Sequence, residues 1–327
     1  MSEQILIVGA GAIGGMLAGY LGAAGRDVTV FARGLTARTI TERGIRLVTP
    51  EQTEIHTRPR VADGSTPLAP AGIVIFATKA FSLGAALAQV RGAIGPDTLV
   101  APVVNGVPWW FGTAQQPVRA VDPRGELAAA VAPDRLVGAV TYSPAWRSVE
   151  NATWTQTVPG QLTLGPVTAG GDPFAAATIA QAFTGSPFEA VVSDDIRRAV
   201  WNKFVTNAAF NTLCALTGAR QCDVARDAGT GPVAEAIMRE VQALATACGS
   251  GISGSIDAKL AQARDKGIHK PSTLQDFEAG REIEIGALVD APLELAERQG
   301  VPMPELTRIG ALLRLKAAVA GLLPETT

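Results

Sequence analysis

One short segment constrains the fold of this chain more than any other, the glycine-rich run GAGAIGG that begins at Gly9. It follows the apolar run QILIV, and it precedes a helical pattern through Leu21 and a second apolar run, DVTVF, at 27–31. Strand, glycine turn, helix and strand in this order form one right-handed crossover unit. In that context Gly-x-Gly-x-x-Gly is typical of a dinucleotide-binding site, because it places a helix N-terminus against the phosphates.

Each glycine of the motif has its own physical role. Gly9 permits the tight turn, Gly11 removes a side chain that would block the pyrophosphate, and Gly14 lets the helix pack closely on the strand. With the residues that open the helix, the candidate cofactor site comprises Gly9, Gly11, Ala12, Ile13 and Gly14. The structural alternative is a strand–helix turn that is merely closely packed.

The end of the second strand bears on the choice of cofactor. An NAD-binding unit usually carries Asp or Glu there, about 20 residues after the glycine motif, to bind the ribose 2′-hydroxyl. This chain has VFARG instead, with Arg33 and no acidic residue at that point. A guanidinium can pair with a 2′-phosphate, so the sequence favours NADP over NAD, and a surface arginine is the alternative.

Two further strands end in candidate ligand-binding residues. The segments GIVIFATK at 72–79 and DTLVAPVVNG at 97–106 are almost wholly apolar, as in buried parallel strands, and a helix fits between them around 81–94. Lys79 could face the cofactor or solvent. Asn105 could bind the cofactor or the substrate beside the nicotinamide, or simply form an Asn-Gly turn.

After residue 106 the predicted secondary structure changes from alternating strands and helices to loop and strands, and then to helices alone. Residues 107–135 read mostly as loop, and LVGAVTYSPAW, GQLTLG and FEAVVS read as strands, with a helix at 173–183 before the last of them. After Ser193 only helical patterns remain. We therefore predict a dinucleotide-binding domain of residues 1–193 and a helical domain of residues 194–327.

The helical domain opens with a polar stripe on an otherwise apolar helix, WNKFVTNAAFNTL at 201–213. Lys203, Asn207 and Asn211 recur every four residues and therefore share one helix face. A solvated face would normally mix acidic and basic residues, whereas one cation and two amides suit a small polar ligand. The alternative is an ordinary exposed edge of a buried helix.

A second polar stretch, KPSTLQDFEAGREIEI, spans 270–285. Ser272 precedes a helical pattern and Gln275 follows three residues later, which fits a capping box. Glu284 lies in a later, largely apolar turn. Its carboxylate could pair with the lysine of the polar stripe, or it could be a solvated glutamate.

Together these segments resemble the ketopantoate reductases (2-dehydropantoate 2-reductases), which belong to the 6-phosphogluconate-dehydrogenase-like oxidoreductases. The resemblance covers nearly the whole chain and rests on GAGAIGG, ATKAF, VVNG, WNKFVTNAAFN and KPSTLQDFEAGREIEI. It implies an α/β fold with an N-terminal Rossmann-type doubly wound sheet, an all-α C-terminal domain and a cleft between them. The substrate-binding residues that it implies are Asn105, Asn207, Asn211 and Ser272.

The resemblance also implies a reaction, the NADPH-dependent reduction of a 2-oxo acid to a 2-hydroxy acid, with ketopantoate as the default substrate. Protonated Lys203 would stabilise the alkoxide-like oxygen and donate a proton, and Glu284 would favour the charged lysine. Two alternatives stay open: a dehydrogenase of the same scaffold for a bulkier ketone or imine, and a non-catalytic NADP-binding sensor. The neighbouring Trp109 and Trp110 bear on the first, because aromatic side chains often line pockets, although a core or dimer contact explains them equally well.

Composition and charge exclude several classes of binding partner. The net charge is −2 with no basic block, so we expect neither nucleic acid nor an anionic membrane surface as a partner. No stretch has the roughly 18 uninterrupted apolar residues of a membrane span. The three cysteines lie far apart without metal-ligand spacing, which predicts a reduced cytoplasmic protein and no metal site. We expect a small-molecule substrate and a homodimer formed through the apolar helical domain.

Overall fold

The computed structural model describes residues 4–168 and 171–324. The chain forms two compact units, of which the first comprises Met1–Val104 with Ala129–Ile196 and the second Asn105–Ala128 with Arg197–Thr327. All residues from Arg197 onward belong to the second unit, so this boundary lies just after the expected one at 193. The second unit also includes the segment 105–128, which the sequence analysis assigns to the first domain.

The first unit is built on a parallel five-stranded sheet with the order β5-β2-β1-β6-β7. Its strands are β1 (Ile5–Val8), β2 (Val28–Phe31), β5 (Arg60–Ala62), β6 (Ile73–Phe76) and β7 (Leu99–Pro102), and the helices of this part are α1 (Ala12–Ala23), α2 (Gly34–Arg43) and α3 (Leu83–Val90). Every residue of β1, β2, β6 and β7 is buried, as a sheet covered on both faces requires. The predicted Rossmann-type sheet is confirmed.

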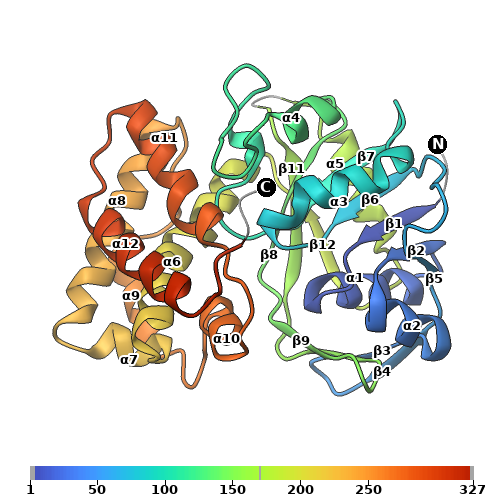
Figure 1. The fold of residues 1–327 in the computed structure, drawn as a ribbon, viewed down its shortest axis with the longest axis horizontal. Coiled ribbons are helices and arrows are strands. Elements are labelled where there is room, and N and C mark those ends of the chain that lie inside the picture. Colours follow the sequence, from blue (N-terminus) through green and yellow to red (C-terminus); the bar gives the residue numbers. More distant parts are fainter. Residues whose placement is uncertain (1–3, 169–170, 325–327) are drawn as a thin grey trace. The chain divides into compact units, whose positions relative to one another are not determined.

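Two smaller sheets complete the first unit. The four-stranded sheet β4-β3-β10-β9 contains β3 (Ile45–Val48), β4 (Glu54–Thr57), β9 (Ala145–Ser148) and β10 (Thr153–Gln156), and the three-stranded sheet β12-β11-β8 contains β8 (Val137–Thr141), β11 (Gln161–Pro166) and β12 (Glu189–Val192). Helix α5 (Phe174–Ala182) also belongs to this unit, and α4 (Glu126–Ala130) spans the return from the second unit to the first. Helix α1 packs against the five-stranded sheet and also against the four-stranded sheet, as Figure 1 shows.

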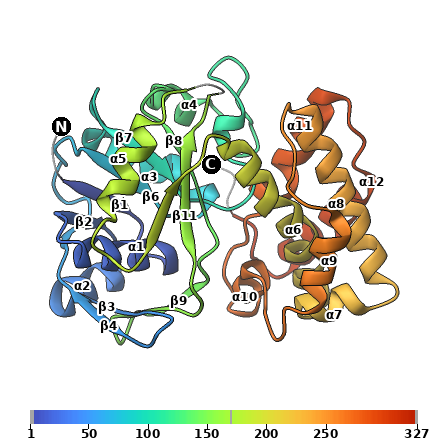
Figure 2. The ribbon, with the colours of Figure 1, turned by 180° about the vertical axis from the view of Figure 1, so that it is seen from behind.

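The second unit is helical, as predicted. Its helices are α6 (Ile196–Thr217), α7 (Gln221–Arg226), α8 (Thr230–Ala247), α9 (Ile256–Arg264), α10 (Ser272–Glu278), a π-helical turn (Gly286–Asp290), α11 (Ala291–Gln299) and α12 (Pro304–Val319) (Figure 2). The long helix α6 buries Trp201, Phe204 and Phe210 on different sides, so it forms the core of this unit. None of the helices in the described part of the chain is long and apolar enough to cross a membrane.

The predicted capping box at Ser272 is wrong. Ser272 is the first residue of α10, and the N-cap is Pro271. Proline has no backbone N–H, so the side chain of Gln275 has no N-cap amide to accept from, and its Nε2 donates instead to the carbonyl of Lys270 at 2.8 Å.

Hydrogen bonds between the segment 105–128 and two helical elements, the π-helical turn and α11, hold this segment in the second unit. The backbone amide of Val107 donates to the carbonyl of Ala287 at 2.9 Å. The carboxylate of Glu294 accepts from two successive amides, those of residues 119 and 120, at 2.9 Å each. Arg298 donates to two carbonyls of the same segment and forms an ion pair with Glu294. A long loop is thereby fixed to one rigid helix.

We predict that Gly14→Ala destabilises the first unit. A Cβ on Gly14 would lie 1.9 Å from the carbonyl oxygen of Gly9, and rigid backbone has to move to relieve that overlap. The free energy of unfolding in denaturant should fall by about 1–3 kcal/mol. The matched control is Gly84→Ala, also in a helix, where a Cβ meets nothing within 4 Å and alanine should be neutral or stabilising by about 0.5–1 kcal/mol. Equal stability of the two variants would contradict the close packing of the turn.

Candidate active site

The glycine turn has the geometry of a phosphate cradle. Gly11 is the N-cap of α1 and offers no side chain to its free amides. A Cβ on Gly11 would meet only the carbonyl oxygen of Ala77, at 3.7 Å, so the space in front of the helix is open, whereas Gly9 has φ +97° and is tightly packed. Beside it, the hydroxyl of Thr78 is buried without a hydrogen-bond partner among the described residues. Open space, free amides and an unsatisfied hydroxyl fit the phosphates of a dinucleotide.

The sheet brings the other candidate cofactor residues to the same edge. Val8 of β1 is in register with the last residue of β2 and with the last residue of β6. Arg33, the exposed N-cap of α2, therefore follows one neighbouring strand, and Lys79, the N-cap of the 3₁₀ turn Ala80–Ser82, follows the other. The carboxyl ends of parallel strands are where such sheets bind ligands. Contact of Arg33 and Lys79 with a cofactor stays a prediction.

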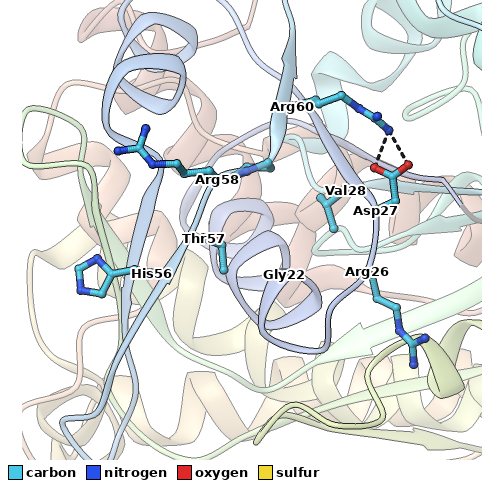
Figure 3. Close-up of a pocket in the computed structure, with 9 residues that line it drawn as sticks. Gly22, Arg26, Asp27, Val28, His56, Thr57, Arg58 and Arg60 are labelled. Atoms are coloured by element: carbon cyan, nitrogen blue, oxygen red, sulfur yellow. Dashed lines mark hydrogen bonds and ion pairs between the residues drawn. The ribbon is translucent and has the colours of Figure 1, made fainter.

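A pocket of about 250 Å³ lies at the opposite edge, beside the amino ends of β2 and β5 (Figure 3). Its basic side chains already have protein partners: Arg60 donates to both carboxylate oxygens of Asp27, and Arg26 donates to backbone carbonyls at the C-terminal end of α5 and just beyond it. His56 lines this pocket and contacts Glu54. None of the predicted site residues lines it, so it is not the candidate active site.

The polar stripe of α6 contributes to a second site, which lies within the second unit. The ammonium of Lys203 donates to Oδ1 of Asn105 at 2.8 Å. Gly106 allows this contact because it has φ +80°, and a Cβ there would lie 2.5 Å from the carbonyl oxygen of Ala287. Asn105 thus lies in a bend beside Gly106 and accepts a hydrogen bond from the lysine, while its contact with a ligand stays a prediction.

Burial and charge act on Lys203 in opposite directions. Desolvation lowers the pKa of its ammonium to about 8, and the nearby charge of Glu284 raises that pKa in part. Glu284 is only 5 % exposed and lies two positions before the π-helical turn, a kind of turn often found at functional sites. Its pairing with the lysine is the alternative that the structure supports, and a solvated glutamate is excluded.

The other three predicted substrate-binding residues differ in their exposure to solvent. Asn211 is buried, at 4 % exposure, and Asn207 is half-buried one turn earlier on α6. Ser272 opens α10 and is exposed. A substrate-binding role for Asn207, Asn211 and Ser272 stays a prediction.

Of the two buried tryptophans after Asn105, Trp110 belongs to a packed aromatic cluster. Trp109 and Trp110 are 2 % and 5 % exposed. The ring of Phe111 lies 4.8 Å from that of Trp110 and 5.2 Å from that of Trp201 on α6, and the Arg197 guanidinium stacks over Phe111 at 4.8 Å. This cluster fastens the segment 105–128 to α6, which is the core role left open by the sequence.

Two residues that sequence reasoning did not single out touch the glycine turn. Trp154 of β10 donates from Nε1 to the carbonyl of Gly11 at 3.0 Å, and Arg147 of β9 donates to the carbonyl of Ala10 at 2.6 Å. No local pattern marks them, because they reach the turn through the pairing of a separate sheet.

Comparison with known proteins gives consistent matches over nearly the whole chain. Residues 5–169 match the family model "Ketopantoate reductase PanE/ApbA", and residues 195–317 match its C-terminal companion. A 2-dehydropantoate 2-reductase of Mesorhizobium japonicum is 36 % identical over 97 % of this chain and 99 % of its own length. A candidate ketopantoate reductase of known structure from Ralstonia solanacearum MolK2 is 33 % identical, with a TM-score of 0.90 over 98 % of this chain and 100 % of that one. The fold is also shared, at 20 % identity and a TM-score of 0.83 over 97 % of this chain and 99 % of the other, by a D-mandelate dehydrogenase with NADH and anilino(oxo)acetate.

We predict that Glu284→Gln lowers the pKa of Lys203 below its value of about 8 in the wild type. The amide keeps the volume of the carboxylate but removes the negative charge that favours the ammonium. Assigned NMR titration of the lysine ammonium measures this directly. The control is Glu278→Gln, which removes an exposed carboxylate paired with Lys270 and should leave Lys203 unchanged. An unchanged or raised pKa in Glu284→Gln would contradict the pairing.

Proposed function

The chain belongs to the ketopantoate reductase family, and on that premise we propose that it reduces ketopantoate to pantoate with NADPH. The observation that carries the proposal is the Lys203 ammonium, held at 2.8 Å by Asn105 and stabilised by the nearby negative charge of buried Glu284. Reduction of a carbonyl needs a proton donor at the oxygen, and a lysine with a pKa near 8 suits that task at neutral pH.

The first unit would bind NADPH through the amides that open α1 and through Arg33 and Lys79. The bound dihydronicotinamide supplies a hydride to the carbonyl carbon of the substrate. Preference for NADPH over NADH is supported by Arg33, which stands where an NAD-binding unit would carry an acidic residue.

The second unit would handle the oxygen and the proton. Protonated Lys203 hydrogen-bonds the carbonyl oxygen, stabilises the negative charge that develops there, and gives up its proton to form the hydroxyl. Asn105 orients the ammonium through the hydrogen bond from Nζ, and Glu284 keeps it charged until the transfer. Asn207, Asn211 and Ser272 would bind the carboxylate and the distal hydroxyl, so that the carbonyl is held in a reactive orientation.

The other two functions have less support. The proposal of a bulkier ketone or imine was based on Trp109 and Trp110, but both are buried, and Trp110 packs in the aromatic cluster with Phe111 and Trp201. A non-catalytic NADP sensor has no need for a desolvated lysine paired with a buried carboxylate.

We also propose that the protein acts in the cytoplasm as a homodimer. The helix α12 presents Leu312, Leu315 and Val319 at 56 %, 64 % and 83 % exposure. These residues recur at helical spacing on one face, and such a stripe can bury itself against the same stripe of a second copy.

We predict that Lys203→Ala removes most of the turnover without removing cofactor binding. Loss of the proton donor should lower kcat for NADPH oxidation with ketopantoate by about 10²-fold or more. NADPH affinity, measured by fluorescence titration, should stay within about twofold because the lysine belongs to the other unit. Lys259→Ala on α9 controls for removal of a lysine. A variant with wild-type kcat would contradict the mechanism, and a wild type that turns over only other ketones would contradict the substrate.

We predict that Leu315→Glu gives a monomer. In a dimer that packs two such stripes together, a carboxylate at this position would be buried in an apolar interface, which is strongly unfavourable. Sedimentation velocity measures the mass, with Ala258→Glu on the exposed face of α9 as a control for an added surface carboxylate. A wild type that is monomeric would contradict the proposed dimer. A Leu315→Glu variant that is still dimeric would show that the interface lies elsewhere.

A further inference from the structure

Arg147 joins two segments that flank the adenosine end of a dinucleotide site. It lies on β9, and its Nη1 donates to the carbonyl of Ala10 at 2.6 Å and to the hydroxyl of Thr36 at 3.4 Å. Ala10 is the residue between the first two glycines of the turn, and Thr36 lies in the first turn of α2, just after Arg33. In a Rossmann unit the ribose of the adenosine lies between the glycine turn and the end of the second strand.

The four-stranded sheet explains how this arginine reaches the turn. Arg147 is directly opposite Trp154 in the antiparallel pair of β9 and β10, so both side chains stand on the same face. Trp154 is fully buried, donates to the carbonyl of Gly11 and packs against Gly15, where a Cβ would lie 2.0 Å from its Nε1. The tryptophan therefore fixes the sheet against α1, and the exposed arginine beside it extends over the outer side of the turn.

We propose that Arg147 binds the 2′-phosphate of NADPH together with Arg33 and thereby sets the preference for NADPH over NADH. This inference rests on the proposed use of NADPH. Both guanidinium groups are exposed, and both are next to the start of α2. A guanidinium has five N–H donors in a planar fork, so it can retain the loop carbonyl and still pair with phosphate oxygens. A second cation beside Arg33 suits the 2′-phosphate, which carries close to two negative charges.

A simpler role for Arg147 is to brace the glycine turn through Ala10. The two roles differ in what they recognise. A brace supports the pyrophosphate cradle, which NADPH and NADH share, whereas a phosphate ligand acts only on the cofactor that has the 2′-phosphate. The comparison of paired ligands with and without that group separates them.

The test is equilibrium binding by titration calorimetry of NADPH, NADH, 2′,5′-ADP and 5′-AMP to the full chain. Arg147→Ala should weaken NADPH and 2′,5′-ADP at least about tenfold, as expected for a lost charge-assisted pair, and leave NADH and 5′-AMP within about twofold. Arg147→Lys should recover part of the loss. The control is Arg43→Ala at the far end of α2, whose guanidinium also donates to a backbone carbonyl, that of Glu150, at 2.7 Å.

Each other outcome overturns a specific statement. Equal losses for NADPH and NADH in Arg147→Ala would show a brace, and no loss at all would show that the arginine is dispensable, so either result overturns the inference. If the wild type binds 2′,5′-ADP no better than 5′-AMP, the proposed use of NADPH fails, and the inference fails with it. If the wild type prefers 2′,5′-ADP and Arg147→Ala keeps that preference, NADPH use stands and only the role of Arg147 falls. Thermal unfolding of each variant checks that it is folded.

Discussion

The hydrogen bond from Lys203 to Asn105 is the interaction on which the candidate active site depends. An ordinary lysine has a pKa of about 10.4 and is a weak acid at neutral pH, and a fully desolvated one loses its proton altogether. Here burial lowers the pKa to about 8 while Glu284 opposes the shift, so the ammonium stays charged but gives up its proton more readily. The amide of Asn105 then fixes the direction in which that ammonium points. A proton donor of this kind needs all three residues in place.

That requirement accounts for an otherwise unexpected feature of the fold. Asn105 comes soon after β7, the last strand of the parallel sheet, yet it belongs to the helical unit. Hydrogen bonds of Glu294 and Arg298 and the aromatic cluster around Trp110 fasten its segment there. The donor site is therefore assembled within one compact unit. Most of the predicted cofactor residues, namely those of the glycine turn with Arg33 and Lys79, belong to the other unit, so mutation should separate binding of the dinucleotide from protonation of the substrate.

Sequence motifs and hydrophobic periodicity predicted the features that depend on neighbouring residues. The glycine turn, the buried strands and the stripe of α6 follow from motif and period, and the structure confirms that architecture. The pairing of Lys203 with Glu284 joins residues far apart in sequence, and only the family resemblance favoured it over a solvated glutamate. The hairpin of β3 and β4 was not predicted, although Ile45 and Leu47 alternate with less buried residues, because short alternating runs are weak signals. The contact of Arg147 with the glycine turn depends on the pairing of β9 with β10, which no window of sequence reveals.

Chemical rescue of Lys203→Ala would test the proton-donor role most directly. Single-turnover oxidation of bound NADPH by ketopantoate is followed with increasing concentrations of small alkylammonium ions. The account predicts that these ions restore the rate of the variant in a saturable manner, faster with the more acidic ammonium ions of similar size, and leave the wild type unaffected. Failure of every ammonium ion to accelerate a folded variant that binds NADPH, or equal acceleration of the wild type, would contradict the assignment of Lys203 as the proton donor.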